Sequence, residues 1–472
     1  MDQDLASRQE ARELAQLAQQ AQQKLRTFSQ AQLDQITQAV SQAFSANAAK
    51  LGRMAQEETG FGNAKDKETK NRFASEKVYE AIQSMKTVGL LDENREKKLW
   101  EIGVPVGVIA AIVPSTNPTS TVCHNAMIAL KAGCAIVFTP HPAAAKCTFE
   151  AVQVVAQAAQ AAGCPKGAVS CMKLSTMEGT KELMTCPQVR LILATGGPGM
   201  VRAAYSSGKP AIGVGAGNGP AYIHHSADVS KAVEQILSSK TFDNGTICAS
   251  EQSILVERSL DQRVRQELSR QGGYLMNDQE AQKVGKILFR PDGRLNPKIV
   301  GRTAAEIANQ AGISIPSNTR VLLAQQTQVG DAAPYSWEKL CPVLAYYVEE
   351  NEDQILHRAQ ELLYLEGAGH SFMIHAQDEA VVRRFALEIP VSRFLVNTPG
   401  ALGGIGATTN LFPAMTLGCG AVGGSSSSNN IGPMDLINVR RVAWGTESKP
   451  SQALPDEDLI SALAAEIMKK FL

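Results

Sequence analysis

Residues 104–113 have the sequence Val-Pro-Val-Gly-Val-Ile-Ala-Ala-Ile-Val, which is a continuous apolar run. Such a run predicts a strand that is buried on both faces, as the strands of parallel sheets are. A loop at 114–118 follows, and a helical pattern covers 119–132. A second buried strand is predicted at 134–138 and a second helix at 144–162. Because strands alternate with helices, this part of the chain predicts a doubly wound parallel sheet.

The same alternation continues along the chain. Strands predicted at 168–174 and 189–194 flank a helix at 177–184. A second set begins after residue 250, with strands predicted at 253–256, 321–324, 344–348, 371–375 and 393–396. Two alternating sets in a chain of 472 residues predict two α/β domains, the second starting near residue 225.

Both ends of the chain carry helical patterns. Residues 4–58 are rich in Ala, Gln and Leu, and predict a helical layer packed on the first domain; a partner-binding arm is the alternative. Residues 65–95 are heavily charged and predict a solvated helical region. Residues 445–455 have the composition of a linker, and 456–472 repeat apolar pairs at helical spacing. This tethered helix is predicted to dock on a partner, with packing on its own domain as the alternative.

Composition and charge argue against several classes of protein. The 46 basic and 46 acidic residues balance to zero, so the basic excess that attracts nucleic acid is missing. No apolar run approaches the roughly 18–20 residues that cross a bilayer, and the acidic first residues are unlike a secretory signal. Nine cysteines without a Cys-x-x-Cys pair indicate neither a metal site nor a disulfide framework. A reducing, cytoplasmic setting is therefore expected.

One cysteine lies in a setting that differs from that of a packing cysteine. Residues 241–252 have the sequence Thr-Phe-Asp-Asn-Gly-Thr-Ile-Cys-Ala-Ser-Glu-Gln, so Cys248 stands between a helical pattern and an apolar run. Gly245 allows the backbone to bend there and to approach a ligand. Cys248 is therefore a candidate nucleophile, and packing is the alternative role.

Glycine-rich turns at 195–199 and 213–219 are candidates for phosphate binding. The first lies between a predicted strand and a predicted helix, where backbone N–H groups can bind a phosphate. A tight strand-to-helix turn needs glycine in any case, and the Gly-x-Gly-x-x-Gly fingerprint is missing after the first strand. The turns alone therefore leave a nucleotide site open.

Five sets of residues resemble the aldehyde dehydrogenase superfamily over almost the full length of the chain. They are Pro-Ser-Thr-Asn-Pro at 114–118, Ala-Thr-Gly-Gly at 194–197, Phe-Asp-Asn-Gly-Thr-Ile-Cys at 242–248, Glu-Lys-Leu-Cys-Pro-Val at 338–343, and Leu-Gly-Gly-Ile-Gly at 402–406 with Thr-Leu-Gly-Cys-Gly at 416–420. The chain most resembles the coenzyme A-acylating members of the acetaldehyde or propionaldehyde type, which are associated with bacterial microcompartments. It is also similar to the aldehyde dehydrogenase half of bifunctional aldehyde-alcohol dehydrogenases.

The resemblance implies an α/β fold of two doubly wound domains with a small oligomerisation element and a tethered C-terminal helix. Residues 1–224 would form N-terminal helices and a Rossmann-like cofactor-binding domain, and 225–425 a catalytic domain. Residues 426–446 would return to the cofactor domain and the oligomerisation element, and 447–472 would be the linker and helix. The family forms homodimers or homotetramers. The helix at 456–472 resembles peptides that bind shell proteins, which implies a place inside a bacterial microcompartment.

The resemblance also implies roles for single residues. Cys248 would attack the aldehyde, and Asn117 would stabilise the oxyanion together with the backbone N–H of Cys248; an Asx turn is the alternative for Asn117. Glu338 would bond a cofactor ribose unless it is a surface carboxylate, and His370 would assist near the site unless it is a turn residue. The implied cofactor-binding residues are Ser115, Thr116, Thr139, Pro140, Thr195, Gly196, Gly197, Gly215 and Glu338.

Two departures from the hydrolytic members bear on the reaction. Val214 stands nearest the position of their water-activating glutamate, and valine cannot act as a base. The thioester on Cys248 would then persist until the thiol of coenzyme A attacks it. A lysine near Thr139 is also absent, which leaves NAD against NADP open. The expected reaction converts a short aliphatic aldehyde, coenzyme A and NAD⁺ to acyl-coenzyme A and NADH. The alternatives are a hydrolytic aldehyde dehydrogenase and a non-catalytic shell scaffold.

Overall fold

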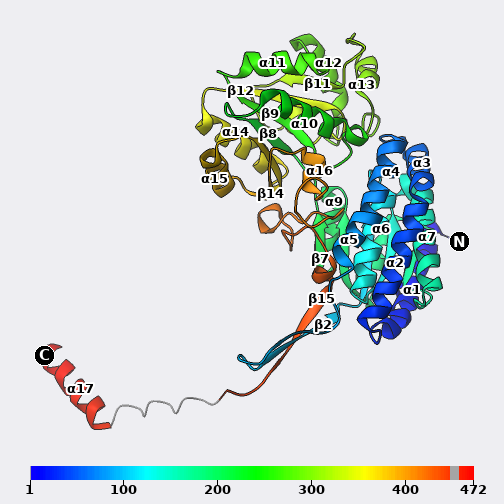
Figure 1. The fold of residues 1–472 in the computed structure, drawn as a ribbon, viewed down its shortest axis with the longest axis vertical. Helices are drawn as coiled ribbons and strands as arrows, with labels where there is room; N and C mark the ends of the chain where they lie inside the picture. Colours follow the sequence, from blue (N-terminus) through cyan, green and yellow to red (C-terminus); the bar gives the residue numbers. More distant parts are fainter. Residues whose placement is uncertain (1, 447–456, 472) are drawn as a thin grey trace.

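A computed structural model describes residues 2–446 and 457–471 of the protein. Figure 1 shows two α/β bodies and a narrow arm of strands that extends from them. One body holds a five-stranded sheet, the other holds a seven-stranded sheet, and the arm holds a three-stranded sheet. The predicted architecture of two α/β domains with a small additional element is therefore confirmed.

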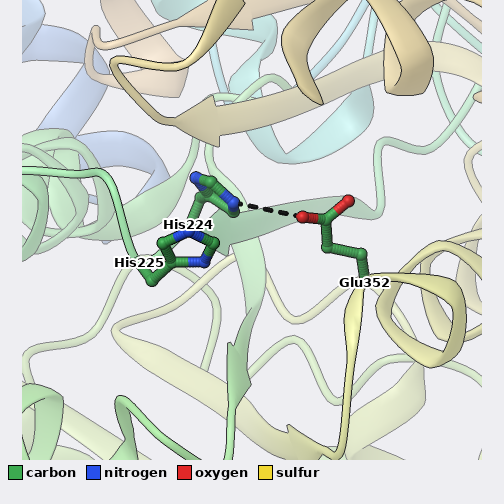
Figure 2. A group of neighbouring side chains, drawn as sticks. All are labelled: His224, His225 and Glu352. Atoms are coloured by element: carbon green, nitrogen blue, oxygen red, sulfur yellow. Dashed lines mark hydrogen bonds and ion pairs between the residues drawn. The ribbon is translucent and has the colours of Figure 1, made fainter. Parts of the chain in front are cut away.

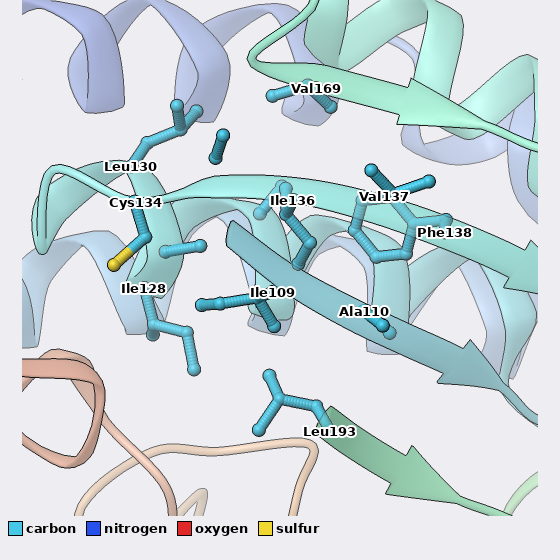
Figure 3. Packing of buried hydrophobic residues seen from close by; sticks show 14 of the residues in the cluster. Ile109, Ala110, Ile128, Leu130, Cys134, Ile136, Val137, Phe138, Val169 and Leu193 are labelled. Carbon is cyan, nitrogen blue, oxygen red and sulfur yellow. The ribbon is translucent and has the colours of Figure 1, made fainter. Parts of the chain in front are cut away.

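The first domain is built on the five-stranded parallel sheet. Its strand order is β5 (Val169–Cys171), β4 (Ala135–Pro140), β3 (Val108–Val113), β6 (Val189–Thr195) and β7 (Ala211–Val214). All six residues of β3 are buried, as the apolar sequence predicts. Figure 3 shows the core around it, where Ile109 of β3 lies close to Ile136 of β4 and to Ile128 of the helix between these strands.

The apolar run at 104–113 forms two strands and not the single strand expected. β2 (Leu99–Pro105) ends inside the run, and β3 begins three residues later. Gly107 between them has a φ of +126°, which glycine adopts far more readily than other residues. β2 pairs with β1 (Gly89–Asn94) and β15 (Ile437–Ala443) in the antiparallel arm. The sequence hides the change of sheet because both strands are apolar where they meet.

The helices of this domain come mainly from the first 205 residues. They are α1 (Gln3–Leu25), α2 (Gln30–Ala46), α3 (Ala48–Thr59), α4 (Ala64–Arg72), α5 (Val78–Ile82), α6 (Pro118–Lys131), α7 (Ala145–Ala161), α8 (Met177–Thr185) and α9 (Pro198–Tyr205), with a π-helical turn at Phe73–Lys77. Ala11, Ala15 and Ala18 recur on one face of α1 and are fully buried, which lets α1 approach α8 and β4 closely. The predicted N-terminal helical layer is confirmed, as three successive helices.

The second domain is built on the seven-stranded parallel sheet. Its strand order is β10 (Gly273–Leu275), β11 (Val321–Gln325), β12 (Val343–Glu349), β9 (Glu251–Glu257), β8 (Gly219–Ile223), β13 (Gly369–His375) and β14 (Val391–Val396). Alternate residues of β9 enter two separate cores: Ile254 and Val256 pack with one set of helices, and Leu255 packs with the other. The helices are α10 (Val229–Thr241), α11 (Asp261–Arg270), α12 (Asp278–Leu288), α13 (Ala304–Ala311), α14 (Glu352–Leu365), α15 (Glu379–Glu388) and α16 (Gly400–Gly404).

The domain boundary predicted at residue 224 is wrong by one strand. β8 pairs with β9 and β13, so it belongs to the second sheet, and the second domain begins at or before Gly219. The glycines at 213–219 gave this region the composition of a turn and hid the strand that follows. Further on, Ile431 and Leu436 pack in the core of the first domain before β15 joins the arm. The oligomerisation role of the arm stays a prediction.

The C-terminal helix, α17 (Glu457–Phe471), forms where it was predicted. Its side chains from 459 to 470 are exposed, including Leu459, Leu463 and Ile467. The linker predicted at 445–455 lies mostly outside the described residues. Among the described helices, none combines the length and the apolar character that a membrane span requires.

Candidate active site

Cys248 lies in a tight turn between a 3₁₀ helix at Phe242–Gly245 and the start of β9. All nine cysteines lie in the described part of the chain and are free, and Cys248 alone is half-buried while the other eight are buried. Gly217 supports this turn from the start of β8. A Cβ on Gly217 would lie 1.9 Å from the Cys248 carbonyl oxygen and 3.2 Å from Cε1 of His370. The turn, Gly217 and the His370 ring are therefore packed against one another.

The backbone before Cys248 is held in an unusual conformation. Asp243 and Asn244 have φ values of 47° and 51°, in the left-handed region that side chains other than glycine rarely adopt. Asp66 of α4 accepts a 2.7 Å hydrogen bond from the Asp243 N–H, and Asn244 donates to the Gly301 carbonyl at 2.9 Å. Backbone strain of this kind persists where the surroundings enforce it, as they often do at functional sites.

A buried cluster of charges anchors Asp243 to α4. The Asp243 carboxylate forms ion pairs with Lys70 and with Lys67, the latter at 3.0 Å, and all three side chains are buried. Burial alone would raise the pKa of Asp243, but the two ammonium groups hold it below its ordinary value. Burial lowers the pKa of Lys70 to about 8, although Asp243 acts in the opposite direction. Helix α4 of the first domain is thereby fixed to the turn that carries Cys248.

Asn117 precedes α6, at the end of the loop that follows β3. Its side chain makes no capping bond to α6 within the described structure, which excludes the Asx-turn alternative there. Instead, Oδ1 accepts a hydrogen bond from Lys70, and Nδ2 donates to the Thr246 carbonyl at 3.2 Å. Nδ2 also lies 3.2 Å from the Thr116 hydroxyl. Asn117 is thus tied to the Cys248 turn through Thr246, two residues before the thiol.

The groups around Cys248 set its protonation. Burial, together with Glu338 and Cys419, raises the pKa of the Cys248 thiol to about 12, and Arg393 opposes this shift. Burial lowers the pKa of His370 to about 3, and Arg393 adds to the effect. The His370 Nε2 atom is buried and has no hydrogen-bond partner among the described residues. In the free protein the site therefore holds a protonated thiol beside a neutral imidazole.

Glu338 is not the surface carboxylate that was the alternative reading of its sequence. It is half-buried, and its Oε1 atom accepts a 3.0 Å hydrogen bond from the Gly217 N–H. Its own N–H donates to Glu366 at 2.8 Å. Burial and the charge of Glu366 raise the pKa of Glu338 to about 8. The structure therefore brings Glu338 to Gly217, which itself supports the Cys248 turn.

The residues predicted to bind a cofactor meet at the carboxyl ends of β3 and β6. β4, which follows β3 in the chain, lies on one side of this pair of strands, and β7, which follows β6, lies on the other side. The carboxyl ends of β3 and β6 therefore flank a topological switch point, which is where α/β sheets bind ligands. Ser115 and Thr116 follow β3, and Thr195 to Gly197 connect β6 to α9. The Thr195 hydroxyl is buried without a hydrogen-bond partner in the described structure. A Cβ at Gly197 or Gly215 would meet no described atom within 4 Å, so this edge can admit a phosphate or a ribose.

Thr139 and Pro140 lie at the carboxyl end of β4, beside this edge, but both are buried. The Thr139 hydroxyl lies 3.0 Å from the hydroxyls of Ser175 and of Thr180. The Pro140 carbonyl accepts a 2.7 Å hydrogen bond from Ser175. These groups are engaged inside the protein, so their contribution to cofactor binding has less structural support than that of Thr195.

Val214 ends β7 and is 2% exposed. Its apolar side chain is buried, so it supplies no proton acceptor at the position where a base was considered.

The sequence did not reveal two further residues of this site. Lys67 and Lys70 fall in the segment at 65–95 that was predicted to be solvated, and that prediction is wrong for both of them. The signal that could have found them is their three-residue spacing, which places two lysines on one face of a helix.

A second polar cluster lies at the carboxyl edge of the other sheet. His224, His225 and Glu352 each bring one possible metal-ligand atom within 4.8 Å of the others (Figure 2). The Ser226 hydroxyl accepts hydrogen bonds from the N–H groups of 377–378, so its proton is directed to His224 Nδ1 at 2.8 Å. His224 Nε2 then carries a proton that faces Glu352 at 3.3 Å. The cluster is therefore a hydrogen-bonded network in which the facing His224 nitrogen is occupied.

Comparison with known protein families agrees with this site. The model of the aldehyde dehydrogenase family matches residues 1–287. The bifunctional aldehyde-alcohol dehydrogenase AdhE of Escherichia coli K12 is 44% identical over 434 residues, which cover 91% of this chain and 49% of that protein. The chain thus spans about half the length of the curated relatives that it matches first. An acetylating succinate-semialdehyde dehydrogenase of Clostridium kluyveri is 34% identical, with 92% of this chain and 95% of that protein covered.

Solved structures share the fold as well. An acetylating aldehyde dehydrogenase from Geobacillus thermoglucosidasius has 49% identity and a TM-score of 0.94, covering 96% of this chain and 100% of that one. A propionaldehyde dehydrogenase from Rhodopseudomonas palustris, with bound CoA and an acylated cysteine, has 28% identity and a TM-score of 0.85, covering 92% and 97%. A propionaldehyde dehydrogenase from the fucose utilisation microcompartment of Clostridium phytofermentans has 29% identity and a TM-score of 0.81, covering 91% and 96%. The predicted resemblance to the acylating members is confirmed, and the chain belongs to the aldehyde dehydrogenase family.

Proposed function

We propose that this protein is a coenzyme A-acylating aldehyde dehydrogenase that oxidises a short aliphatic aldehyde, with NAD⁺ as the hydride acceptor. The observation that carries the proposal is the pairing of a half-buried Cys248 with a buried Val214. Cys248 provides a nucleophile, and Val214 cannot activate water. The names of the matched relatives and structures, several of them acetylating or CoA-bound, support the same reaction.

The first step places a thiolate on the aldehyde. Cys248 gives up its proton, and the neutral His370, whose ring packs near the Cys248 turn and whose Nε2 is open, is a candidate acceptor. The sulfur adds to the carbonyl carbon, and the carbonyl oxygen becomes an oxyanion that the Asn117 amide and the Cys248 N–H stabilise. Bound at the edge of β3 and β6, NAD⁺ supplies the acceptor for the hydride that leaves this carbon. A thioester then remains on Cys248.

The second step returns the enzyme to its free form. The thiol of coenzyme A attacks the thioester carbon, and the Cys248 sulfur leaves as the new carbon–sulfur bond forms. The proton of the incoming thiol passes to the Cys248 sulfur, and the proton that His370 took up in the first step is released to solvent. The acyl group thus moves from the thioester on Cys248 to the thioester of coenzyme A, and this step consumes no water.

Propionaldehyde and acetaldehyde are the proposed substrates, and the proposed setting is a bacterial microcompartment. The microcompartment enzyme among the matched structures supports this setting. The exposed apolar side chains of α17 suit docking on shell proteins, and the three-stranded arm suits assembly into a homodimer or homotetramer. Removal of residues 447–472 should leave the activity in solution unchanged and abolish co-purification with shells. Retention of the truncated protein in purified shells would contradict the docking role.

The reaction is tested by following NADH formation from propanal with and without coenzyme A, and by identifying the acyl product by mass spectrometry. Sustained turnover that requires coenzyme A, with propionyl-coenzyme A as the product, is expected. Equal rates without coenzyme A and release of propionate would favour the hydrolytic alternative. Cys248→Ser is the matched control, because it keeps the size of the side chain and removes most of its nucleophilicity. Full activity of that variant would move the nucleophile elsewhere, and absence of activity in the wild-type protein would favour the scaffold alternative.

A further inference from the structure

Lys70 is buried on α4, in a helical segment that precedes Cys248 by more than 170 residues in the sequence. Its ammonium group donates hydrogen bonds to the Asp243 carboxylate and to Oδ1 of Asn117, and it lies 3.4 Å from the Thr246 hydroxyl. One buried cation thus touches the oxyanion-binding amide and also the turn that carries the nucleophile. A buried charge is costly, so its position needs an explanation beyond stability.

The chemistry of the ammonium group fixes how the Asn117 amide can lie. An ammonium has three donors and no acceptor, so the atom of Asn117 that faces it must be the oxygen. The Nδ2 atom is then turned away from Lys70. One N–H of Nδ2 donates to the Thr246 carbonyl and the other donates to the Thr116 hydroxyl at 3.2 Å, so an incoming oxyanion would replace the Thr116 hydroxyl as the acceptor. The opposite orientation would place the NH₂ group against the ammonium and leave the oxygen facing the Thr246 carbonyl.

We propose that Lys70 is a positioning residue, held by Asp243, that fixes the Asn117 amide with its N–H toward the oxyanion and polarises that N–H for donation. A cation on the carbonyl oxygen of an amide draws electron density from the nitrogen, which strengthens the hydrogen bond that the N–H gives. This inference rests on the proposed function in two respects, since it requires an oxyanion on a carbon bound to Cys248 and a hydrogen bond from the Asn117 amide to that oxyanion. That oxyanion forms in the acylating and in the hydrolytic reaction alike.

Lys67 shows that pairing with Asp243 does not by itself account for Lys70. Lys67 pairs with the same carboxylate at 3.0 Å, and its second contact is the Thr116 carbonyl at 3.1 Å. The pair with Lys67 would already neutralise Asp243. Of these two lysines, Lys70 is the one that contacts the Asn117 side chain in the described structure. Asp66 also faces this cluster and accepts from the Asp243 N–H.

The two lysines therefore form a matched pair for a test. Lys70→Met and Lys67→Met each remove one cation from Asp243, but only the first releases the Asn117 amide. Lys70→Met should lower kcat by about 100-fold, close to the effect of Asn117→Ala, because removal of one oxyanion donor costs about 100- to 1000-fold. KM for the aldehyde should change little. Lys67→Met should lose far less activity for a similar loss of thermal stability.

A double-mutant cycle separates positioning from a general structural role. In the Asn117→Ala background, Lys70→Met should cause little further loss of kcat, since the amide that Lys70 orients is already gone. An equal loss in both backgrounds, or an equal loss for Lys67→Met, would overturn the proposal. Lys70→Arg and Lys70→Gln cover the case in which Lys70→Met fails to fold. Arginine only donates and should retain most activity, whereas glutamine can also accept and should not; the reverse order would refute the orientation argument.

Failure of this inference can be told apart from failure of the proposed function. The cycle is measured on aldehyde-dependent NADH formation under whichever condition the wild-type protein turns over, with or without coenzyme A. A wild-type protein that needs no coenzyme A would change the assigned reaction and leave the cycle readable. A cycle with additive losses would remove the role of Lys70 and leave the assigned reaction intact.

Discussion

Replacement of Gly217 by alanine should displace Cys248, the proposed nucleophile, without changing its side chain. The added Cβ would lie 1.9 Å from the Cys248 carbonyl oxygen and 2.8 Å from its carbonyl carbon. Ordinary contact begins near 3.4 Å, so the two backbones must move about 1.5 Å apart. The two Cys248 atoms that the Cβ would meet both belong to the backbone, so no change of side-chain rotamer can relieve the overlap. His370, 3.2 Å from the same Cβ, closes another side.

A displacement of about 1 Å at a catalytic group can lower the rate about 100-fold. Gly217→Ala should therefore reduce kcat at least about 100-fold, which corresponds to about 2.7 kcal/mol of transition-state stabilisation. The loss of folding stability from overpacking should stay near about 1–3 kcal/mol. The assay compares kcat with the unfolding midpoint in denaturant, and Gly445→Ala is the control, because a Cβ there meets no described atom within 4 Å and the residue lies outside the site. A Gly217→Ala enzyme within a few-fold of wild-type kcat would refute the packing of Gly217 on Cys248.

Three further predictions concern the core, pH and the thiol. Ile109→Ala, in the middle of β3 and fully buried, should lower the free energy of unfolding by about 2–5 kcal/mol, as measured by urea unfolding. Burial lowers the pKa of His375 from 6.5 to about 4, so the unfolded state binds more protons between these values, and stability falls as the pH drops below about 6.5. His375→Gln should reduce the loss between pH 7 and pH 5 by about 2 kcal/mol, and an unchanged pH profile would contradict this assignment. Cys248 should react slowly with iodoacetamide in the free enzyme, because burial and Glu338 raise the pKa of its thiol to about 12, and reaction as fast as that of free cysteine would contradict it.

The sequence predicted those parts of the fold that depend on local pattern. The buried strands at 134–138 and 189–194 correspond to β4 and β6, because both faces of a central parallel strand require apolar residues. The local pattern did not predict the three-stranded arm or the place of β8 in the second sheet. β2 and β3 form one apolar run although they belong to different sheets, and β8 follows directly on a glycine-rich turn. Sheet membership is decided by pairing between distant segments, which a local pattern does not contain.

The same limit applies to the site. Cys248 and Asn117 each stand in a motif whose composition is unusual for its place, and the structure brings Asn117 to the turn that carries Cys248, while their catalytic roles stay a prediction. Lys67 and Lys70 were not predicted, since a lysine-rich helix is ordinarily solvated and their three-residue spacing places them on one face without showing that this face is buried. Their burial follows from the docking of α4 on the turn at Asp243, across a sequence separation of more than 170 residues. The buried charges beside the Cys248 turn were therefore visible only once the two domains were placed together.

The fate of the thioester on Cys248 depends on which bases the site lacks. Val214 offers none, and burial and the charge of Glu366 raise the pKa of Glu338, the side chain that accepts from the Gly217 N–H, which favours its protonated form. A protonated carboxyl group cannot accept a proton from water. Water has a pKa of about 15.7 and needs strong activation before it attacks. A thiol with a pKa near 8.5 is a few per cent thiolate at pH 7 without any base. His370 is also a weak base, because burial lowers its pKa to about 3. A site without a strong base slows hydrolysis far more than transfer to a thiol, and this difference would favour transfer of the acyl group to coenzyme A.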